Sequence, residues 1–170
     1  MRFDSPKFWR DDSDQNLPDA LMRIIAMLLA EYASISQDNK LTVAGVWDAL
    51  RFQRHTDVPP ADGPVLEVVP VPPVYFVAQI DFSIANGLRH TAALYVRDAD
   101  GRNVVGPLNM PDLQLRMNKH GRPMRHTIVV ALRGLMLPGP GDYAVELHID
   151  ANLVGDTPLY VSDETPNGKP

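Results

Sequence analysis

The chain has 170 residues, a formal net charge of −5 and 45% hydrophobic residues, which is enough apolar material for the core of one globular domain. It contains no cysteine, so disulfide bridges and thiolate metal sites are excluded. The excess of acidic residues argues against a general electrostatic grip on nucleic acid, which is therefore an unlikely partner.

Residues 1–22 are predicted to form a polar N-terminal arm outside the core. Phe8 and Trp9 precede an acidic cluster at 11–14, and no apolar run follows the first basic residues, so we expect no secretory signal. No apolar run approaches the ~20 residues that cross a bilayer, so we expect no membrane partner. We therefore expect a cytoplasmic protein, or a virion protein if the chain is phage-encoded. Residues 162–170 are predicted to be a polar C-terminal tail.

A β-hairpin is predicted over residues 23–47. The stretch 23–30 is apolar on both faces, which is typical of a central strand covered on both sides. Residues 37–39, Gln-Asp-Asn, have turn chemistry, and 40–47 returns as the partner strand. Trp47 is predicted to plug one end of the domain as a structural residue.

A proline-rich connector follows at residues 58–73. Proline donates no ladder hydrogen bond, so this stretch predicts an extended crossover rather than an inner strand. Pro70 and Pro73 also satisfy the P-x-x-P pattern of peptides that bind groove domains, but the need for a crossover favours the connector.

The next two predicted strands, 74–85 and 88–98, are expected to pair as a hairpin. Asp100–Gly101 is a turn signal that leads into short edge strands at 102–108 and 113–118. This turn resembles the first half of a calcium loop, but its glycine stands at the wrong position, so a hairpin turn is expected instead.

The C-terminal half shows the clearest alternation. A strand is predicted over 125–137, followed by a corner, a strand at 143–150 and a returning strand at 153–161. Tyr143 stands just past the corner, where a tyrosine of immunoglobulin-like sandwiches returns its hydroxyl to nearby backbone as a structural lock. About eight short strands and no long helix predict an all-β, antiparallel, immunoglobulin-like β-sandwich over 23–161, with extended arms at both ends.

The sequence contains no recognisable catalytic or metal-binding motif. The five histidines lack the spacing of metal ligands and are predicted to be isolated surface residues. Serine nucleophile elbows and phosphate-binding glycine loops are missing. We therefore expect no enzyme, no metal and no cofactor.

One basic segment stands out in this acidic chain. Residues 113–126 contain no acidic residue. They predict either a solvated hairpin or a patch for an anionic partner, such as the acidic arm of another copy. The candidate partner-binding residues are Arg116, Lys119, Arg122 and Arg125, together with Phe8 and Trp9 of the arm.

Two stretches resemble a family of small uncharacterised bacterial and phage-associated proteins. The first resemblance lies in residues 30–50 and rests on Glu31-Tyr32-Ala33, Lys40-Leu41, Gly45 and Trp47-Asp48; the second rests on residues 140–143, Pro-Gly-Asp-Tyr, and the hairpin 146–159. Asn39 replaces the usual turn glycine, as asparagine can in a left-handed turn. The resemblance covers about residues 24–161. It implies a β-sandwich and a phage context, and it brings no catalytic residues.

The leading hypothesis is a non-enzymatic structural or adaptor subunit that acts by protein–protein contact, through self-association or in a larger assembly. Its most specific form is a phage decoration or minor structural protein. The alternative is a small-ligand or carbohydrate binding module, with its site at one end of the sandwich near Trp47, His55 and the 58–73 loop.

Overall fold

The computed structural model describes residues 22–47, 49–52, 69–82, 87–115 and 125–163. In chain order, its strands are β1 (Met22–Ile35), β2 (Leu41–Trp47), β3 (Ala49–Phe52), β4 (Val69–Pro70), β5 (Val74–Phe82), β6 (Arg89–His90), β7 (Ala92–Asp98), β8 (Asn103–Asn109), β9 (Leu113–Gln114), β10 (Arg125–Leu132), β11 (Met136–Leu137), β12 (Gly141–Ile149) and β13 (Asn152–Asp163). The candidate residues Phe8, Trp9, Arg116, Lys119 and Arg122, and also His55, lie outside the described ranges.

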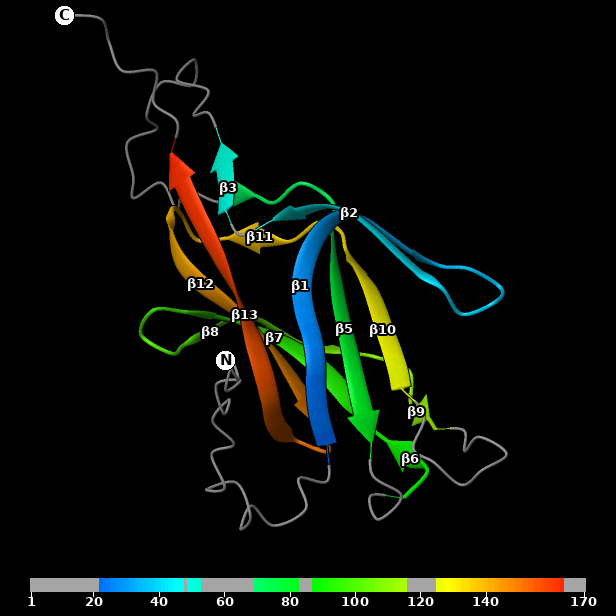
Figure 1. Ribbon diagram of the computed structural model, residues 1–170. Coiled ribbons are helices and arrows are strands. Elements are labelled where there is room, and N and C mark those ends of the chain that lie inside the picture. The colour runs from blue at the N-terminus through cyan, green and yellow to red at the C-terminus, as the bar shows by residue number, and fades with distance from the viewer. Residues whose placement is uncertain (1–21, 48, 53–68, 83–86, 116–124, 164–170) are drawn as a thin grey trace, which may run out of the picture.

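Two main sheets form the two layers of the molecule (Figure 1). The first has the strand order β10-β5-β1-β2, and the second has the order β3-β13-β12-β7-β8. Two-stranded ribbons, β4–β11 and β6–β9, complete the described strands. The predicted all-β, antiparallel sandwich is thus confirmed, with one local exception, because β3 runs parallel to β13.

The core lies between the sheets and is built from alternate residues of their central strands. Along β12 the buried side chains are Tyr143, Val145, Leu147 and Ile149, and along β5 they include Phe76, Ala78, Ile80 and Phe82. This is the period-two burial that the sequence predicts. Burial of apolar area at about 25 cal/mol per Å² is the main force that holds the layers together.

The two sheets approach closely at Gly155 of β13. A Cβ atom built on Gly155 would lie 2.5 Å from Cδ1 of Ile24 and 3.1 Å from Cε of Met27, both on β1. Glycine at this position therefore lets β13 pack directly against the start of β1.

The predicted hairpin is formed by β1 and β2. β1 pairs with β5 only as far as Ala30, so its last five residues pair with β2 alone and project from the body of the sandwich (Figure 1). The turn is closed by hydrogen bonds between Ser36 and Lys40, and Asn39 takes the left-handed conformation, with φ of 60°. The substitution of asparagine for a turn glycine is therefore structurally sound.

β1 is central in its sheet, but the prediction that both its faces are covered holds for only part of its length. Leu29 and Ala30, which point to opposite faces, are fully buried, whereas Arg23 and Ile25 are exposed. A register shift between Ile24 and Ala26 interrupts the pairing with β5, and Ile25 lies at this irregularity.

Two predicted connections are wrong. β5 and β7 do not form a hairpin, because β5 is flanked by β1 and β10 while β7 lies in the other sheet. The predicted strand 125–137 also divides, since β10 ends at Leu132, Gly134 has a left-handed φ of 67°, and β11 pairs with β4. In the first case the sequence predicts two strands, but it does not say whether the second pairs with the first or crosses to the opposite sheet. In the second case a stretch predicted as one strand is broken at Gly134.

Candidate functional site

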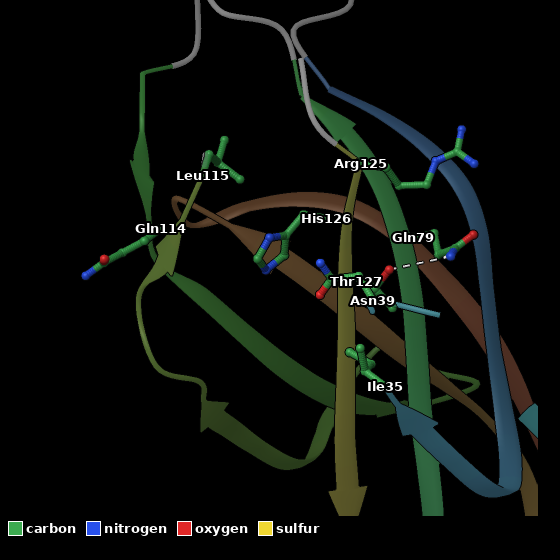
Figure 2. A pocket seen from close by; sticks show the side chains of 8 residues that line it. All are labelled: Ile35, Asn39, Gln79, Gln114, Leu115, Arg125, His126 and Thr127. Atoms are coloured by element: carbon green, nitrogen blue, oxygen red, sulfur yellow. Dashed lines mark hydrogen bonds between the residues drawn. The ribbon is translucent and has the colours of Figure 1, made fainter. Parts of the chain in front are cut away.

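A groove runs beside β10, the strand at one edge of the first sheet. β10 pairs with β5 on one side, and no other described strand pairs with its second side. Figure 2 shows the groove, which has a volume of about 510 Å³. The described residues that line it are Ile35 and Asn39 from the hairpin, Gln79 from β5, Gln114 and Leu115 at β9, and Arg125, His126 and Thr127 from β10.

The groove continues along the backbone of β10. Its second part, of about 300 Å³, is lined by the consecutive residues Met110–Gln114 on one wall and His126–Val130 on the other, with Ile35 nearby. The first wall directs backbone hydrogen bonds away from β10, from Met110 N–H to the Ala92 carbonyl and from Leu115 N–H to the Leu88 carbonyl. Two extended segments thus lie on opposite sides of a slot, which is a suitable shape for a further extended chain.

Polar side chains lie around one end of the groove. Gln79 donates from Nε2 to Oγ1 of Thr127 at 3.5 Å, as the dashed line in Figure 2 shows. Arg125 donates to both carboxylate oxygens of Asp81, at 3.0 and 3.2 Å. The hydrogen bond from Arg125 holds the pKa of Asp81 below its usual value. Arg125, the one described member of the predicted basic patch, is therefore bound to a carboxylate.

His126 projects from β10 into the space between β10 and β9 (Figure 2). Its ring also meets that of Phe82 edge-on, with centroids 6.4 Å apart. Burial lowers the pKa of His126, because desolvation disfavours the charged imidazolium. At neutral pH this part of the groove is therefore lined by a neutral imidazole.

A second histidine, His90, is buried in the sandwich, so the prediction of surface histidines is wrong at this position. Only 4% of His90 is exposed, its ring stacks on Phe82 at 5.0 Å, and Nδ1 lies 2.6 Å from Oδ2 of Asp150. The other oxygen of Asp150 accepts a hydrogen bond from the backbone N–H of Thr91 at 2.9 Å. These bonds tie the β12–β13 turn to the start of β7.

The pair of His90 and Asp150 has the arrangement of a catalytic base and its orienting carboxylate. However, Nε2 of His90 is buried and has no hydrogen-bond partner among the described residues. A general base must reach the proton that it removes, and a covered nitrogen does not reach substrate in this conformation. The geometry favours a structural link between β6 and the β12–β13 turn.

A third polar cluster lies on the outer face of the second sheet. His148 Nε2 is 2.8 Å from Glu146 Oε2, and Arg97 Nε is 2.9 Å from the same oxygen. The N–H of Arg97 Nε is not aligned for a hydrogen bond, so this contact is an ion pair. The ring of Tyr95 lies 4.6 Å from that of His148. Within the described part of the chain, no three potential metal ligands converge.

The predicted structural residues occupy defined positions. Tyr143 is buried, and its hydroxyl donates to the Gly139 carbonyl at 2.8 Å, which is the predicted kind of bond to nearby backbone. Trp47 lies opposite Leu29 and packs against the core while remaining half-buried. At the predicted calcium-like turn, Asp98 Oδ1 instead accepts hydrogen bonds from the backbone of Asp100 and Arg102, as expected for a hairpin turn.

The projecting hairpin carries exposed apolar side chains. The exposed fractions are 50% for Tyr32, 43% for Ile35 and 66% for Val46, and the ring of Tyr32 contacts Tyr75 edge-on at 6.2 Å. β2 is the other edge of the first sheet. It contains neither a charged residue nor a proline, which are the residues that usually protect an edge strand from pairing.

Residues 25–162 match a family that is described as a family of unknown function, DUF6941. The chain belongs to this family. The match begins in β1 and ends in β13, so it spans both main sheets of the DUF6941 sandwich. No curated protein matches the chain. In the described residues, no helix is long and apolar enough to cross a membrane.

Proposed function

We propose that this DUF6941 protein is a structural subunit that associates with further copies of itself through the β1–β2 hairpin. The observation that carries the proposal is the combination of exposed Tyr32, Ile35 and Val46 on one projecting hairpin, with no described strand paired to the outer edge of β2. Solvent-facing apolar side chains on an unprotected edge favour pairing with another strand.

The sequence of β2 is compatible with antiparallel pairing to a second β2. A register centred on Ala44 would place Val43 opposite Gly45 and Thr42 opposite Val46, so larger side chains meet smaller ones. No like charges would meet, because β2 carries none. Such pairing would join two four-stranded sheets across a two-fold axis.

The test is size-exclusion chromatography with light scattering on the full chain across a range of concentrations. We expect oligomers that increase with concentration, and a shift towards monomer in Val46→Lys, because a buried lysine opposes pairing. Leu153→Lys is the matched control, since Leu153 is a 55% exposed leucine on β13. A wild-type chain that stays monomeric, or equal effects of the two lysines, would contradict the proposal.

The more specific form, a decoration or minor structural protein of a phage virion, draws its support from the resemblance described above. It predicts that mass spectrometry of purified particles detects the chain, in a fixed copy number relative to the major capsid subunit.

A second candidate function is the binding of a small polar ligand in the groove beside β10. Its volume of about 510 Å³ lies in the range of ligand sites, and Asn39, Gln79 and Gln114 supply amide groups that could bind hydroxyls. A thermal-shift screen with sugars, nucleotides and divalent ions tests it, because a ligand of the native state raises the melting temperature. A genuine site would lose that shift in Gln114→Ala.

A further inference from the structure

The two main sheets close against each other at one corner of the sandwich and stay apart at another. At the closed corner, Gly155 of β13 packs on Ile24 of β1. At the open corner, β10 is an edge strand of the first sheet, and the 110–114 segment continues from β8, an edge strand of the second. No described strand pairs with β10 on this side. The second part of the groove, a slot of about 300 Å³, therefore lies between the edges of the two sheets.

This slot is lined by the hydrophobic core. Leu113 and Ile128 stand on its opposite walls, and both are members of the core cluster, with only 7% and 5% of their surface exposed. Met110 and Val130 also stand on opposite walls, and both are half-buried and pack against that cluster. An apolar group that entered the slot would therefore exchange water for core side chains on both sides, which is favourable.

The wider part of the groove is polar but close to neutral. Its amide and hydroxyl groups come from Asn39, Gln79, Gln114 and Thr127. Figure 2 shows Gln114 on one side of the groove and Thr127 and Gln79 on the other. The guanidinium of Arg125 is bound by both carboxylate oxygens of Asp81, and His126 is neutral at neutral pH because burial lowers its pKa. Such a lining suits hydroxyl or amide groups better than a charged group.

The two parts form one site, because Ile35, Gln114, His126 and Thr127 line both of them. We propose that the groove binds a neutral amphiphile, with its hydroxyl- or amide-bearing head in the wider part and its aliphatic tail in the slot. The proposal rests on the second candidate function above, ligand binding in this groove, and adds the chemical class of the ligand. The exposed carboxylate of Asp112 at the slot disfavours an anionic ligand such as a fatty acid.

The size of the slot limits the length of the tail. A volume of about 300 Å³ holds about ten groups of the size of a water molecule, at ~30 Å³ each, and a methylene group is of similar size. The affinity should therefore rise with the length of the tail and stop rising near about ten carbons. Adsorption of a detergent on an exposed apolar surface has no such limit, so the dependence on chain length distinguishes the two.

Calorimetric titration of the full chain with a series of alkyl glucosides, from methyl to dodecyl, tests the proposal. Each compound is used below its critical micelle concentration. Monooctanoylglycerol supplies a second neutral head, and octanoate supplies the same tail with a charged head. We expect octyl glucoside to bind at least about tenfold more tightly than methyl glucoside, and octanoate to bind much more weakly than the neutral compounds.

A pair of variants locates the tail. Met110→Gln keeps the size of the side chain but makes the wall of the slot polar, and Met136→Gln is the matched control on β11, where the methionine is 53% exposed. We expect Met110→Gln to lose most of the gain from the octyl chain while its affinity for methyl glucoside is unchanged. The control should bind like wild type. Melting curves check that each variant is folded, and Val130→Thr replaces Met110→Gln if the latter unfolds.

The possible failures of this inference and of the second candidate function are distinguishable. Equal affinities for methyl and octyl glucoside would overturn the amphiphile and leave the binding of a polar ligand intact. If no neutral amphiphile binds, the inference also fails, and the thermal-shift screen decides separately on the second candidate function. The inference is likewise overturned if affinity keeps rising well beyond ten carbons, if octanoate binds as tightly as octyl glucoside, or if the two glutamine variants behave alike.

Discussion

At the scale of single residues, Tyr143 and Asp150 each hold two parts of the sandwich together. The hydroxyl of Tyr143 closes the corner before β12 by its bond to Gly139. Asp150 sits in the β12–β13 turn with a positive φ of 50° and receives hydrogen bonds from His90 and Thr91. Both contacts are specific enough to be tested by removing one group.

We predict that Tyr143→Phe lowers the free energy of unfolding by about 1–2 kcal/mol, because it leaves the buried carbonyl of Gly139 without its donor. Tyr160→Phe serves as a control, since Tyr160 is 46% exposed, and should change stability by less than about 0.5 kcal/mol. Urea unfolding measures both. Equal effects of the two changes on the free energy of unfolding would show that the bond from Tyr143 to Gly139 does not stabilise the fold.

The bond to Asp150 predicts a dependence of stability on pH. The hydrogen bond from His90, followed by that from the Thr91 backbone, holds the pKa of Asp150 below its usual value. The unfolded chain therefore takes up this proton at a higher pH, near the ordinary value of about 3.9. The stabilisation is complete well above this pH and is lost as the pH falls through the folded-state pKa.

We expect Asp150→Asn to remove part of this acid sensitivity. Urea midpoints of wild type and variant, measured from neutral pH down to acid, should converge as the pH falls below about 4. Asp81 keeps its own lowered pKa in both proteins, so some acid sensitivity remains. If the two curves ran parallel over the whole range, the bond between Asp150 and His90 would not contribute to stability.

At the scale of elements, the contact between β13 and β1 depends on the missing side chain of Gly155. Gly155→Ala should destabilise by about 1–3 kcal/mol, because its Cβ would meet Cδ1 of Ile24. Ile24→Val deletes that Cδ1 atom and should cost about 0.5–1.5 kcal/mol alone.

The two changes should be coupled. In a double-mutant cycle followed by chemical denaturation, Ile24→Val with Gly155→Ala should cost about 1 kcal/mol less than the sum of the single changes. If the changes in the free energy of unfolding were simply additive, the side chains at positions 24 and 155 would not be in contact.

Among these structural elements, those set by neighbouring residues could be predicted from the sequence, and those set by distant residues could not. The alternation of β12 and the Asn39 turn are local patterns, and both were predicted because neighbouring residues determine them. By contrast, His90 and Asp150 are 60 residues apart, and no local signal connects them. The groove beside β10 also escaped prediction, since it exists only because the 110–115 segment bonds towards residues 88–92. The separation of β5 from β7 was missed for a similar reason, as turn chemistry does not specify which sheet the chain enters next.

At the scale of the whole molecule, the first sheet has two edges with different surroundings. The β10 edge faces a groove with walls on both sides, whereas the β2 edge lies on a hairpin that projects from the body (Figure 1). We propose that the second edge pairs between chains. Two-fold pairing at the β2 edge is closed, so it forms defined pairs rather than open fibres.

Backbone hydrogen exchange in the full chain, measured at several protein concentrations, tests this account most directly. We predict that exchange along β2 slows as the concentration rises, because pairing between chains covers this edge, and that exchange along β10 does not change with concentration. The account would be contradicted if the outward-facing amides of β2 exchanged rapidly and at rates that did not depend on concentration.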